Sequence, residues 1–251
     1  MPANDLETAE AQAAAAGNEQ ATKRAYVKRM FSQIAPRYDL LNHLLSFNID
    51  VHWRKKAIAA LKWSRAPRGT YIDLCAGTLD VAASLSRQPG FAGRVVGADF
   101  AEPMLRAGTG KSLPAIVWPV VADALELPLP DNVASGAIVA FGIRNVADLD
   151  AGLAEVYRVL ERGARFVILE FATPRAPLIR GAYQFYFHRV LPWIGSRISG
   201  HRSAYSYLPL SVERFPSEPE LAARLRAAGF DDVRWQTLTF GAVAIHSAIK
   251  R

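Results

Sequence analysis

One glycine and two polar side chains stand where predicted strands end, in an arrangement that can hold a nucleoside. Residues 71–75 (YIDLC) predict a buried strand that runs into a turn at Gly77 and Thr78. Residues 94–100 predict a second strand, and Asp99 lies at its end. Glycine lets backbone approach a ligand closely, and a carboxylate can accept hydrogen bonds from two ribose hydroxyls. The spacing therefore predicts an adenosine-containing cofactor beyond the carboxyl ends of parallel strands.

The turn differs from one that binds a dinucleotide. A pyrophosphate needs several backbone amides, and hence a G-x-G-x-x-G turn, whereas Gly77 is the only glycine between residues 71 and 86. Asp73 and Asp80 flank it, and they would repel phosphates and attract a cation. The sulfonium and amino group of S-adenosyl-L-methionine fit that requirement. An alternative stays open, because Asp99 could simply cap a helix from residue 101.

Composition limits the classes of protein to consider. The chain has 251 residues, 51% of them hydrophobic and 21% charged, as expected for one large or two small globular domains. Its single cysteine, Cys75, excludes an internal disulfide, fits a reducing compartment and is expected to pack rather than react. The histidines lack metal-ligand spacing, so no metal site is expected. With no secretory signal and no apolar run of ~18 residues, we expect a cytoplasmic protein.

Charge is unevenly placed along the chain. The net charge of the chain is +7. Residues 1–20 hold four acidic and no basic residues and so carry −4, which leaves +11 on the remaining residues. Residues 172–205 contain five arginines and no acid, interleaved with aromatic residues. Such a segment suits the inner face of a membrane or a lipid-like substrate, although single-stranded nucleic acid or plain solubility would also explain it.

The chain divides into three parts by pattern. Residues 1–20 are rich in alanine and predict a disordered tail, and residues 21–66 predict a helical cap that Pro36 interrupts. Residues 67–251 predict an α/β domain, with residues 172–205 as an insertion that covers its site.

Strands and helices alternate in the predicted α/β domain. We expect strands over residues 71–75, 94–100, 116–122, 137–141 and 165–171, and helices over residues 80–87, 101–110 and 148–160. A helix over 218–228 precedes two strands, 233–239 and 242–249, whose short connection makes them antiparallel. A doubly wound sheet of seven strands with a C-terminal antiparallel hairpin is typical of class I methyltransferases that use S-adenosyl-L-methionine.

Several motifs resemble one family. Residues 31–42 (FSQIAPRYDLLN) and 141–146 (FGIRNV) are similar to signatures of the ubiquinone/menaquinone biosynthesis C-methyltransferases. Shorter matches are YRVL at 157–160, LEF at 169–171, YSYLP at 205–209 and LTFG at 238–241. The resemblance extends from about Tyr26 to Lys250.

One position departs from the family pattern. The family turn is usually Gly-Thr-Gly-Asp, and Leu79 stands here at the second glycine. Leucine would be costly if the backbone needs a positive φ there, and harmless if its side chain enters the interface between sheet and helix. We expect the second arrangement.

The resemblance implies transfer of a methyl group from S-adenosyl-L-methionine to a ring carbon of a polyprenyl hydroquinone. It further implies that the cofactor is contacted by Asp73, Gly77, Thr78, Asp99, Asp123 and Ala124. Asp99 would hold the ribose and Asp123 the adenine amine, although Asp123 could also be only a turn residue.

For catalysis, the resemblance implies Arg144, Asn145 and Tyr38. Arg144 would lower the pKa of a substrate hydroxyl, Asn145 would orient a water, and Tyr38 would close over the site. The alternatives are a salt bridge behind the sheet for Arg144 and a core position for Tyr38. His201 and Tyr205 in the covering segment are weaker candidates.

The expected partners follow from the substrate. A polyprenyl tail implies peripheral contact with a membrane; a homodimer is a further expectation, and no nucleic acid is expected. Two other functions stay open: a methyltransferase for another phenolic or lipid acceptor, and a cofactor-binding homologue that lacks activity.

Overall fold

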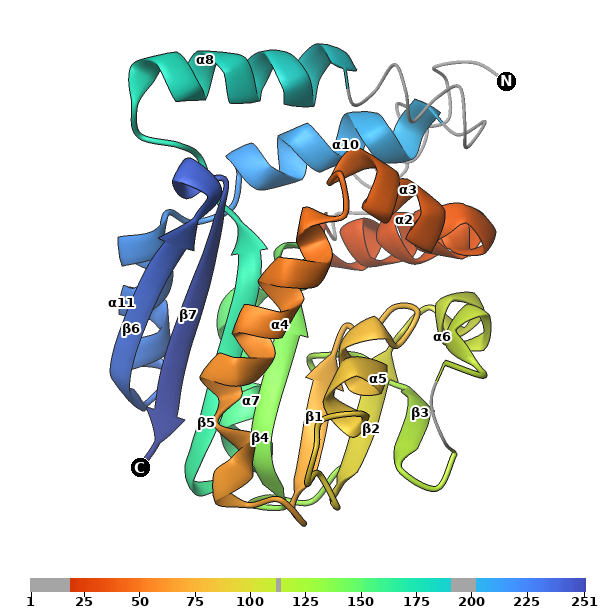
Figure 1. The fold of residues 1–251 in the computed structure, drawn as a ribbon, viewed down its shortest axis with the longest axis vertical. Coiled ribbons are helices and arrows are strands. Elements are labelled where there is room, and N and C mark those ends of the chain that lie inside the picture. The colour runs from red at the N-terminus through yellow and green to blue at the C-terminus, as the bar shows by residue number, and fades with distance from the viewer. Residues whose placement is uncertain (1–18, 112–113, 191–201) are drawn as a thin grey trace.

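A computed structural model describes residues 19–111, 114–190 and 202–251 (Figure 1). Its centre is a seven-stranded sheet with the order β3-β2-β1-β4-β5-β7-β6. The strands are β1 (Thr70–Leu74), β2 (Arg94–Asp99), β3 (Val117–Val121), β4 (Ala134–Ala140), β5 (Leu160–Phe171), β6 (Phe230–Leu238) and β7 (Val243–Lys250). Strands β1 to β5 are parallel, and β7 is antiparallel to both β5 and β6. The predicted fold class is confirmed.

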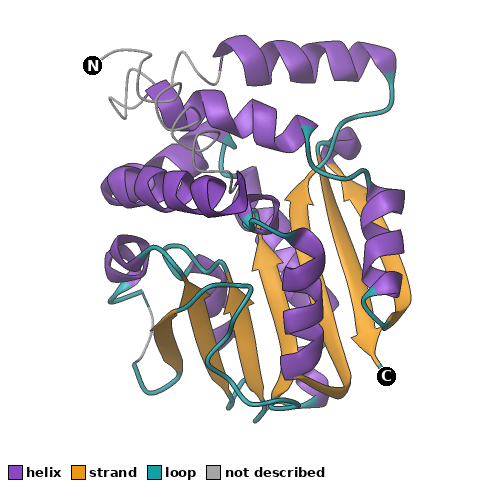
Figure 2. Cartoon of the chain, turned by 180° about the vertical axis from the view of Figure 1, so that it is seen from behind, coloured by secondary structure: helices purple, strands orange, loops and turns teal. Residues whose placement is uncertain are grey.

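Helices cover both faces of the sheet. One face carries α4 (Ile49–Leu61) and α5 (Asp80–Ser86), and the other carries α7 (Leu149–Val159) and α11 (Glu218–Ala227), as Figures 1 and 2 show. Alternate residues of β1 serve the two cores: Ile72 packs with the α7 side and Tyr71 with the α4 side. Helix α6 (Glu102–Gly108) lies near the edge at β3.

A further helical layer lies over the carboxyl ends of the parallel strands. It contains α2 (Glu19–Ile34), α3 (Tyr38–Leu45), α8 (Pro177–Phe185) and α10 (Arg202–Glu213) (Figure 1). The short helix Ala35–Arg37 separates α2 from α3, as the proline at position 36 predicts. Because this layer faces the strand ends, it closes the side of the sheet where ligands bind in such folds.

The structure differs from the predicted elements mainly at β5. Asp148 caps the N-terminus of α7, where its side chain accepts a hydrogen bond from Ala151 N–H (3.0 Å), and the helix ends at Val159. The expected stop at residues 161–163 belongs instead to β5, because Leu160 pairs with Ala134 across an irregular register. Leu160 is fully buried there, so core packing outweighs the turn tendency of Gly163.

The predicted division of the chain stays a prediction. Helix α2 begins at Glu19, and the rest of the expected tail lies outside the described residues. Residues 191–201 of the expected covering segment also lie outside them. Within the described part of the chain, none of the helices combines the length and apolarity that a bilayer span requires.

Candidate active site

Asp99 ties the turn after β1 to the region after β2. Its Oδ2 accepts a hydrogen bond from Gly77 N–H (2.8 Å), and its Oδ1 accepts one from Ala101 N–H (2.8 Å). The Ala101 bond is local, but no side chain caps helix α6, so the capping alternative explains only part of the geometry. Burial raises the pKa of Asp99, and the two N–H donors oppose that rise. The carboxyl group is thus held rigidly at the strand ends.

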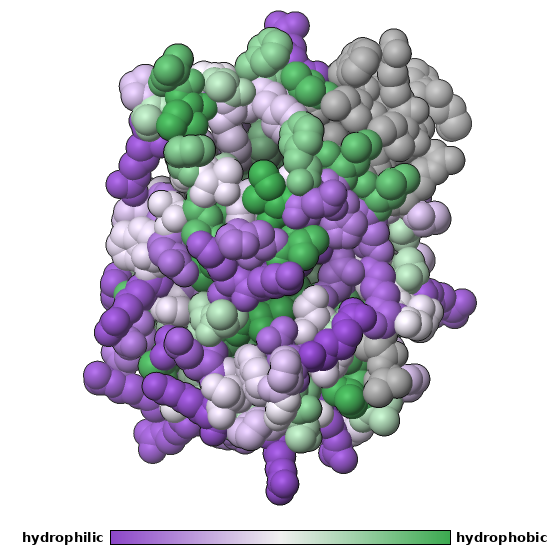
Figure 3. Space-filling view, in the orientation of Figure 1, coloured by the Kyte–Doolittle hydropathy of each residue, from purple (hydrophilic) through white to green (hydrophobic). Residues whose placement is uncertain are grey.

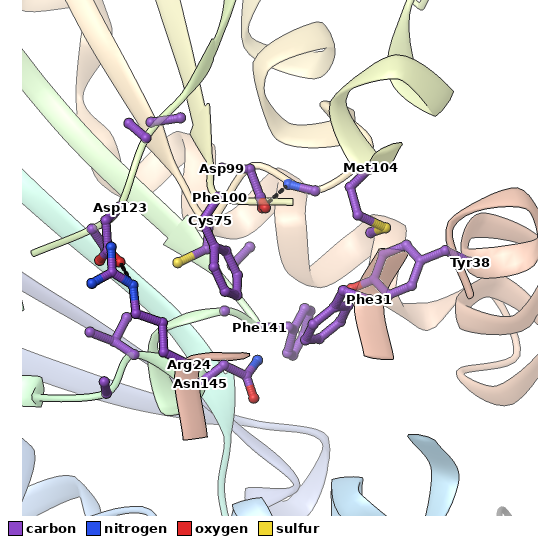
Figure 4. A pocket seen from close by; sticks show the side chains of 18 residues that line it. Arg24, Phe31, Tyr38, Cys75, Asp99, Phe100, Met104, Asp123, Phe141 and Asn145 are labelled. Atoms are coloured by element: carbon purple, nitrogen blue, oxygen red, sulfur yellow. Dashed lines mark hydrogen bonds and ion pairs between the residues drawn. The ribbon is translucent and has the colours of Figure 1, made fainter. Parts of the chain in front are cut away.

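A cleft of about 60 Å³ opens beside this carboxyl group (Figure 4). Four of the predicted cofactor residues line it, namely Gly77, Asp99, Asp123 and Ala124. Tyr38 and Asn145, predicted to be catalytic, line it as well. Residues widely separated in sequence therefore meet in one cleft.

Asp73 and Thr78 do not line that cleft. Asp73 lies under the turn, where it accepts a hydrogen bond from Ala82 N–H (2.9 Å), and burial raises its pKa to about 7. The Thr78 hydroxyl donates to Asp39 Oδ1 of helix α3 (2.5 Å). In the structure both residues fix the turn, one from below and one from the helical layer.

Asp123 is engaged on both oxygens. Its Oδ1 accepts a hydrogen bond from Leu125 N–H (2.8 Å), as expected of a turn acid, and its Oδ2 pairs with Arg24 Nε (2.5 Å). Figure 4 shows Arg24 and Asp123 meeting at one side of the cleft, with Tyr38 and Met104 at the other. Arg24 was not a sequence candidate, and it places a cation from α2 in the lining of the cleft.

Leu79 has both a positive φ and a side chain in the interface between sheet and helix, the two arrangements that the sequence leaves open. Its φ is 63°, so the position needs the left-handed conformation that glycine adopts without cost. Its side chain is nevertheless 2% exposed and packs between the sheet and the helices. The expectation that leucine escapes the backbone cost is therefore wrong, although its side chain is well placed.

A wider cavity of about 280 Å³ lies next to the cleft, under the helical layer. Phe31, Tyr38 and Phe141 line both spaces and so form a shared wall. Most of the remaining wall is apolar or aromatic, with Met30, Ile34, Trp53, Phe171, Phe187 and Leu208 among its members. Such a cavity suits a flat, apolar ring.

Arg144 is one of two largely buried arginines that line the wider cavity, and Arg54 is the other. Its side chain is 7% exposed and pairs with Glu170, 2% exposed, at 2.8 Å. It also donates to the Phe141 carbonyl and to Ser211 Oγ (3.2 Å), and its guanidinium lies 5.4 Å from the centre of the Phe171 ring. The salt-bridge alternative thus describes a pair in the cavity wall rather than one behind the sheet. Burial raises the pKa of Glu170, and Arg144 opposes that rise.

Tyr38 lines both spaces, whereas Asn145 lines the cleft alone. Asn145 lies in the short helix Ile143–Asn145, and its Oδ1 is buried without a hydrogen-bond partner among the described residues. Burial raises the pKa of Tyr38, while a hydrogen bond with Asn42 lowers it. A ligand donor would satisfy the Asn145 oxygen.

Comparison with known proteins agrees with this geometry. The model of the ubiE/COQ5 methyltransferase family matches residues 19–250. The chain belongs to this family. It is 50% identical over 222 residues to the demethylmenaquinone methyltransferase of Thermus thermophilus, across 86% of this chain and 98% of that protein. It is 43% identical over 228 residues to the ubiquinone/menaquinone biosynthesis C-methyltransferase UbiE of Geobacter sulfurreducens, across 89% of this chain and 88% of that protein.

Solved structures share the fold. A SAM-dependent methyltransferase from Thermotoga maritima, described as a possible histamine N-methyltransferase, superposes with a TM-score of 0.62 at 20% identity, over 89% of this chain and 99% of that one. The predicted family resemblance is confirmed, and the chain is a methyltransferase of the ubiE/COQ5 type.

Three further residues around the site of this ubiE/COQ5 methyltransferase were not sequence candidates, namely Asp39, Arg54 and Lys111. Lys111 pairs with Asp39 of α3 (2.5 Å) and with Asp80 of α5 (2.6 Å), and Asp80 also pairs with Arg54 of α4 (2.9 Å). These pairs join the helical layer to the glycine turn. Asp39 stands inside the RYDLLN motif, which was the one available signal.

Two of the weaker candidates cannot be placed. His201 lies outside the described residues, and of Tyr205 only the backbone, in α10, is described. Among the described residues, no three His, Cys, Asp or Glu side chains are grouped as metal ligands. Burial and nearby carboxylates raise the pKa of Cys75, which keeps its thiol protonated and argues against a nucleophilic role.

Proposed function

We propose that this chain transfers the methyl group of S-adenosyl-L-methionine to a ring carbon of a polyprenyl hydroquinone in menaquinone or ubiquinone biosynthesis. The names of its relatives support that acceptor class. The observation that carries the proposal is the shared wall of Phe31, Tyr38 and Phe141 between a small polar cleft and a larger aromatic cavity. Methyl transfer in line needs donor and acceptor on two sides of one opening.

The cleft has the chemistry that the methyl donor requires. Gly77 has a φ of 52°, and a Cβ there would point toward Met104 and Tyr38, so glycine keeps that path open. We propose that Asp99 holds the ribose, that Asp123 accepts from the adenine amine, and that Ala124 packs beside it. Asp73 and Thr78 would hold the turn itself. When bound, the cofactor supplies an electrophilic methyl group beside the shared wall.

The larger cavity has the chemistry that the acceptor requires. A hydroquinone carbon becomes nucleophilic when the neighbouring hydroxyl ionises. The charge of Arg144 favours that ionisation, and the pairing with Glu170 limits it. We propose that Asn145 orients the water that takes the proton and that Tyr38 closes the shared wall. Exclusion of bulk water by the helical layer strengthens each of these interactions.

We also propose that the enzyme takes its acceptor from a membrane surface. Phe47 is 73% exposed, lines the larger cavity and lies 6.4 Å from Tyr186, ring centre to ring centre. Leu178 and Phe185 of α8 are 88% and 64% exposed. Figure 3 shows apolar side chains at the end of the molecule that carries α8. A prenyl tail leaving the cavity would therefore meet an apolar rim.

A product assay tests the proposed reaction. Purified protein would receive S-adenosyl-L-methionine with chemically reduced demethylmenaquinol, or with its benzoquinol counterpart, and mass spectrometry would follow the quinones. A gain of one methylene on either ring supports the proposal and identifies the preferred ring. Cofactor binding without methylation of either ring would contradict the acceptor and favour another phenolic or lipid acceptor. Cofactor binding without methylation of any phenolic or lipid acceptor would favour the cofactor-binding homologue that lacks activity, and no cofactor binding would point to Leu79, at its positive φ, as the cause.

The remaining organisation is proposed as follows. Residues 21–66 act as a cap, residues 172–205 cover the site, residues 67–251 form the catalytic domain, and two chains form a homodimer. Light scattering coupled to size-exclusion chromatography would test the dimer. Limited proteolysis with and without S-adenosylhomocysteine would test the cap, because a cap that closes over the cofactor should be cut more slowly when the cofactor product is bound.

A further inference from the structure

Most polar side chains that face the larger cavity already have partners inside the protein. Asp50 accepts a hydrogen bond from Ser46 Oγ (2.7 Å) and pairs with Arg54 (3.0 Å). Thr239 Oγ1 accepts one from Trp53 Nε1 (2.8 Å). Each of these groups has a hydrogen-bond or ion-pair partner within the wall, and the Asp50 charge is compensated there.

Tyr183 of α8 differs. Its hydroxyl oxygen is buried and has no hydrogen-bond partner among the described residues, although the side chain lines the cavity. A buried hydroxyl without a partner is unfavourable, so native proteins rarely keep one that nothing will satisfy. Tyr183 thus combines a place in the cavity lining with a hydroxyl that no described protein group uses.

The Tyr183 ring is held in place by a series of aromatic contacts. It stacks on Phe187 with ring centres 4.2 Å apart and planes at 26°. Phe187 meets the Phe171 ring edge-on at 5.5 Å, and the Arg144 guanidinium lies over that Phe171 ring. Tyr183 and Arg144 are thus positioned through one aromatic cluster, and they line the same cavity.

We propose that Tyr183 is a catalytic residue that donates a hydrogen bond to the ring oxygen of the acceptor that ionises beside Arg144. The assignment rests on the proposed function and adds a neutral donor to it. Glu170 offsets much of the charge of Arg144, so the guanidinium alone stabilises a phenolate weakly. A tyrosine O–H aimed at the same oxygen adds a hydrogen bond that strengthens as negative charge develops.

The surroundings of Tyr183 suit a donor and not a base. Burial raises the pKa of its hydroxyl, Arg144 lowers it and Glu170 raises it, with burial the largest of the three causes. The hydroxyl therefore keeps its proton throughout the neutral range. Tyr183 belongs to α8, so the helical layer over the strand ends supplies the donor.

The first test compares Tyr183→Phe with Tyr157→Phe. The control makes the same chemical change at a half-buried tyrosine that packs against Phe230, in the core on the opposite face of the sheet from α4. With demethylmenaquinol as acceptor, Y183F should lower kcat by roughly 10- to 100-fold, as expected for a hydrogen bond to a charged oxygen. Y157F should leave kcat unchanged. Cofactor affinity, measured by calorimetry, should be the same in all three proteins.

The second test separates this role from a structural one. The probe is 4-methoxy-1-naphthol, which has one ionisable hydroxyl and whose bound pKa can be followed by ultraviolet absorbance in the presence of S-adenosylhomocysteine. Y183F should raise that bound pKa by about one unit relative to wild type and Y157F. Equal bound pKa values in wild type and Y183F would overturn the role of Tyr183. Failure of the wild-type protein to methylate either quinol would instead overturn the proposed function on which it rests.

Discussion

Leu79 occupies the space that a Cβ on Gly97 would need. A Cβ placed on Gly97 would lie 2.4 Å from Leu79 Cδ2, far inside van der Waals contact. Leu79 precedes α5 and Gly97 lies in β2, so the leucine that replaces a family glycine is accommodated by a glycine in the neighbouring strand. The strained backbone and the buried side chain at position 79 are thus parts of one packing arrangement.

This arrangement predicts strong coupling between positions 79 and 97. Gly97→Ala should lower the free energy of unfolding by roughly 1–3 kcal/mol, because the added methyl overlaps a packed core. In a Leu79→Gly background the same substitution should cost close to nothing, because the overlapping atoms are gone. Urea unfolding of the four proteins gives the coupling energy. Additive effects would show that the two side chains do not compete for space.

The pKa of Asp73 predicts a pH-dependent stability. Its folded value is about 7 and its ordinary value 3.8, so between these the folded protein binds a proton that the unfolded chain has released. Asp73 therefore contributes to the free energy of unfolding in full below about pH 4, and this contribution is lost as the pH rises through 7. Asp73→Asn removes this loss, so its stability relative to wild type should rise by about 2–3 kcal/mol from pH 5 to pH 8. Urea unfolding at both pH values measures it; Glu102→Gln, at an exposed position, should show no such change.

Glu170 should control both stability and the acidity of the acceptor. Glu170→Gln leaves the Arg144 charge buried without its partner, at a cost of roughly 3–5 kcal/mol of unfolding free energy. The cavity then becomes more positive, so the acceptor hydroxyl should ionise more easily and the acid limb of the pH–kcat profile should move to lower pH. Thermal unfolding tests the loss of stability, and a pH–rate series tests the shift of the acid limb. Lower stability with an unmoved acid limb would assign the pair a structural role only.

The features of the fold that a sequence predicts best are those set by neighbouring residues. The glycine turn at Gly77, the acid at Asp99 and the C-terminal hairpin follow from short spacings and strand periodicity, and the structure has all three. The boundary of β5 was missed because pairing with β4 outweighs the local signal of Gly163.

The contacts of the helical layer could not be predicted in the same way. The hydrogen bond from Thr78 to Asp39 joins residues 39 positions apart, and neither residue type indicates which residue it will bond. The aromatic content of residues 172–205 was visible, but only packing shows that Tyr183 keeps an unpartnered hydroxyl inside the cavity. Burial and partnership are properties of the fold, and a single sequence does not encode them in any short pattern.

Arg24 should compete with the cofactor for Asp123. The distance from Arg24 Nε to Asp123 Oδ2 is 2.5 Å, and the Arg24 side chain is 53% exposed. Because of that exposure, loss of the ion pair should lower the free energy of unfolding by less than about 1 kcal/mol. Arg24→Ala frees an Asp123 oxygen, and S-adenosyl-L-methionine should bind up to about 5-fold more tightly. Arg29→Ala, an exposed position on the same helix, is the matched control in calorimetry. Weaker binding by R24A would show that Arg24 itself contacts the cofactor.

Membrane contact should depend on the charges and the apolar side chains of the α8 region. Arg180 and Arg189 are exposed there, and each basic residue near an anionic surface contributes about 1 kcal/mol. Arg180→Gln with Arg189→Gln should therefore weaken co-sedimentation with phosphatidylglycerol-containing vesicles by roughly 30-fold. The matched pair Arg224→Gln and Arg226→Gln, on α11, should have little effect.

The contribution of apolar side chains to membrane contact can be measured with neutral vesicles, where charge plays no part. Leu178→Ser with Phe185→Ser should abolish the binding of the protein to neutral vesicles, because these side chains are among the most exposed apolar residues of the described chain. Turnover of a short-tailed soluble quinol should be unchanged in both double variants, since neither reaches the shared wall. Equal vesicle binding by wild type and both variants would contradict contact through α8 and require the acceptor to enter by another face.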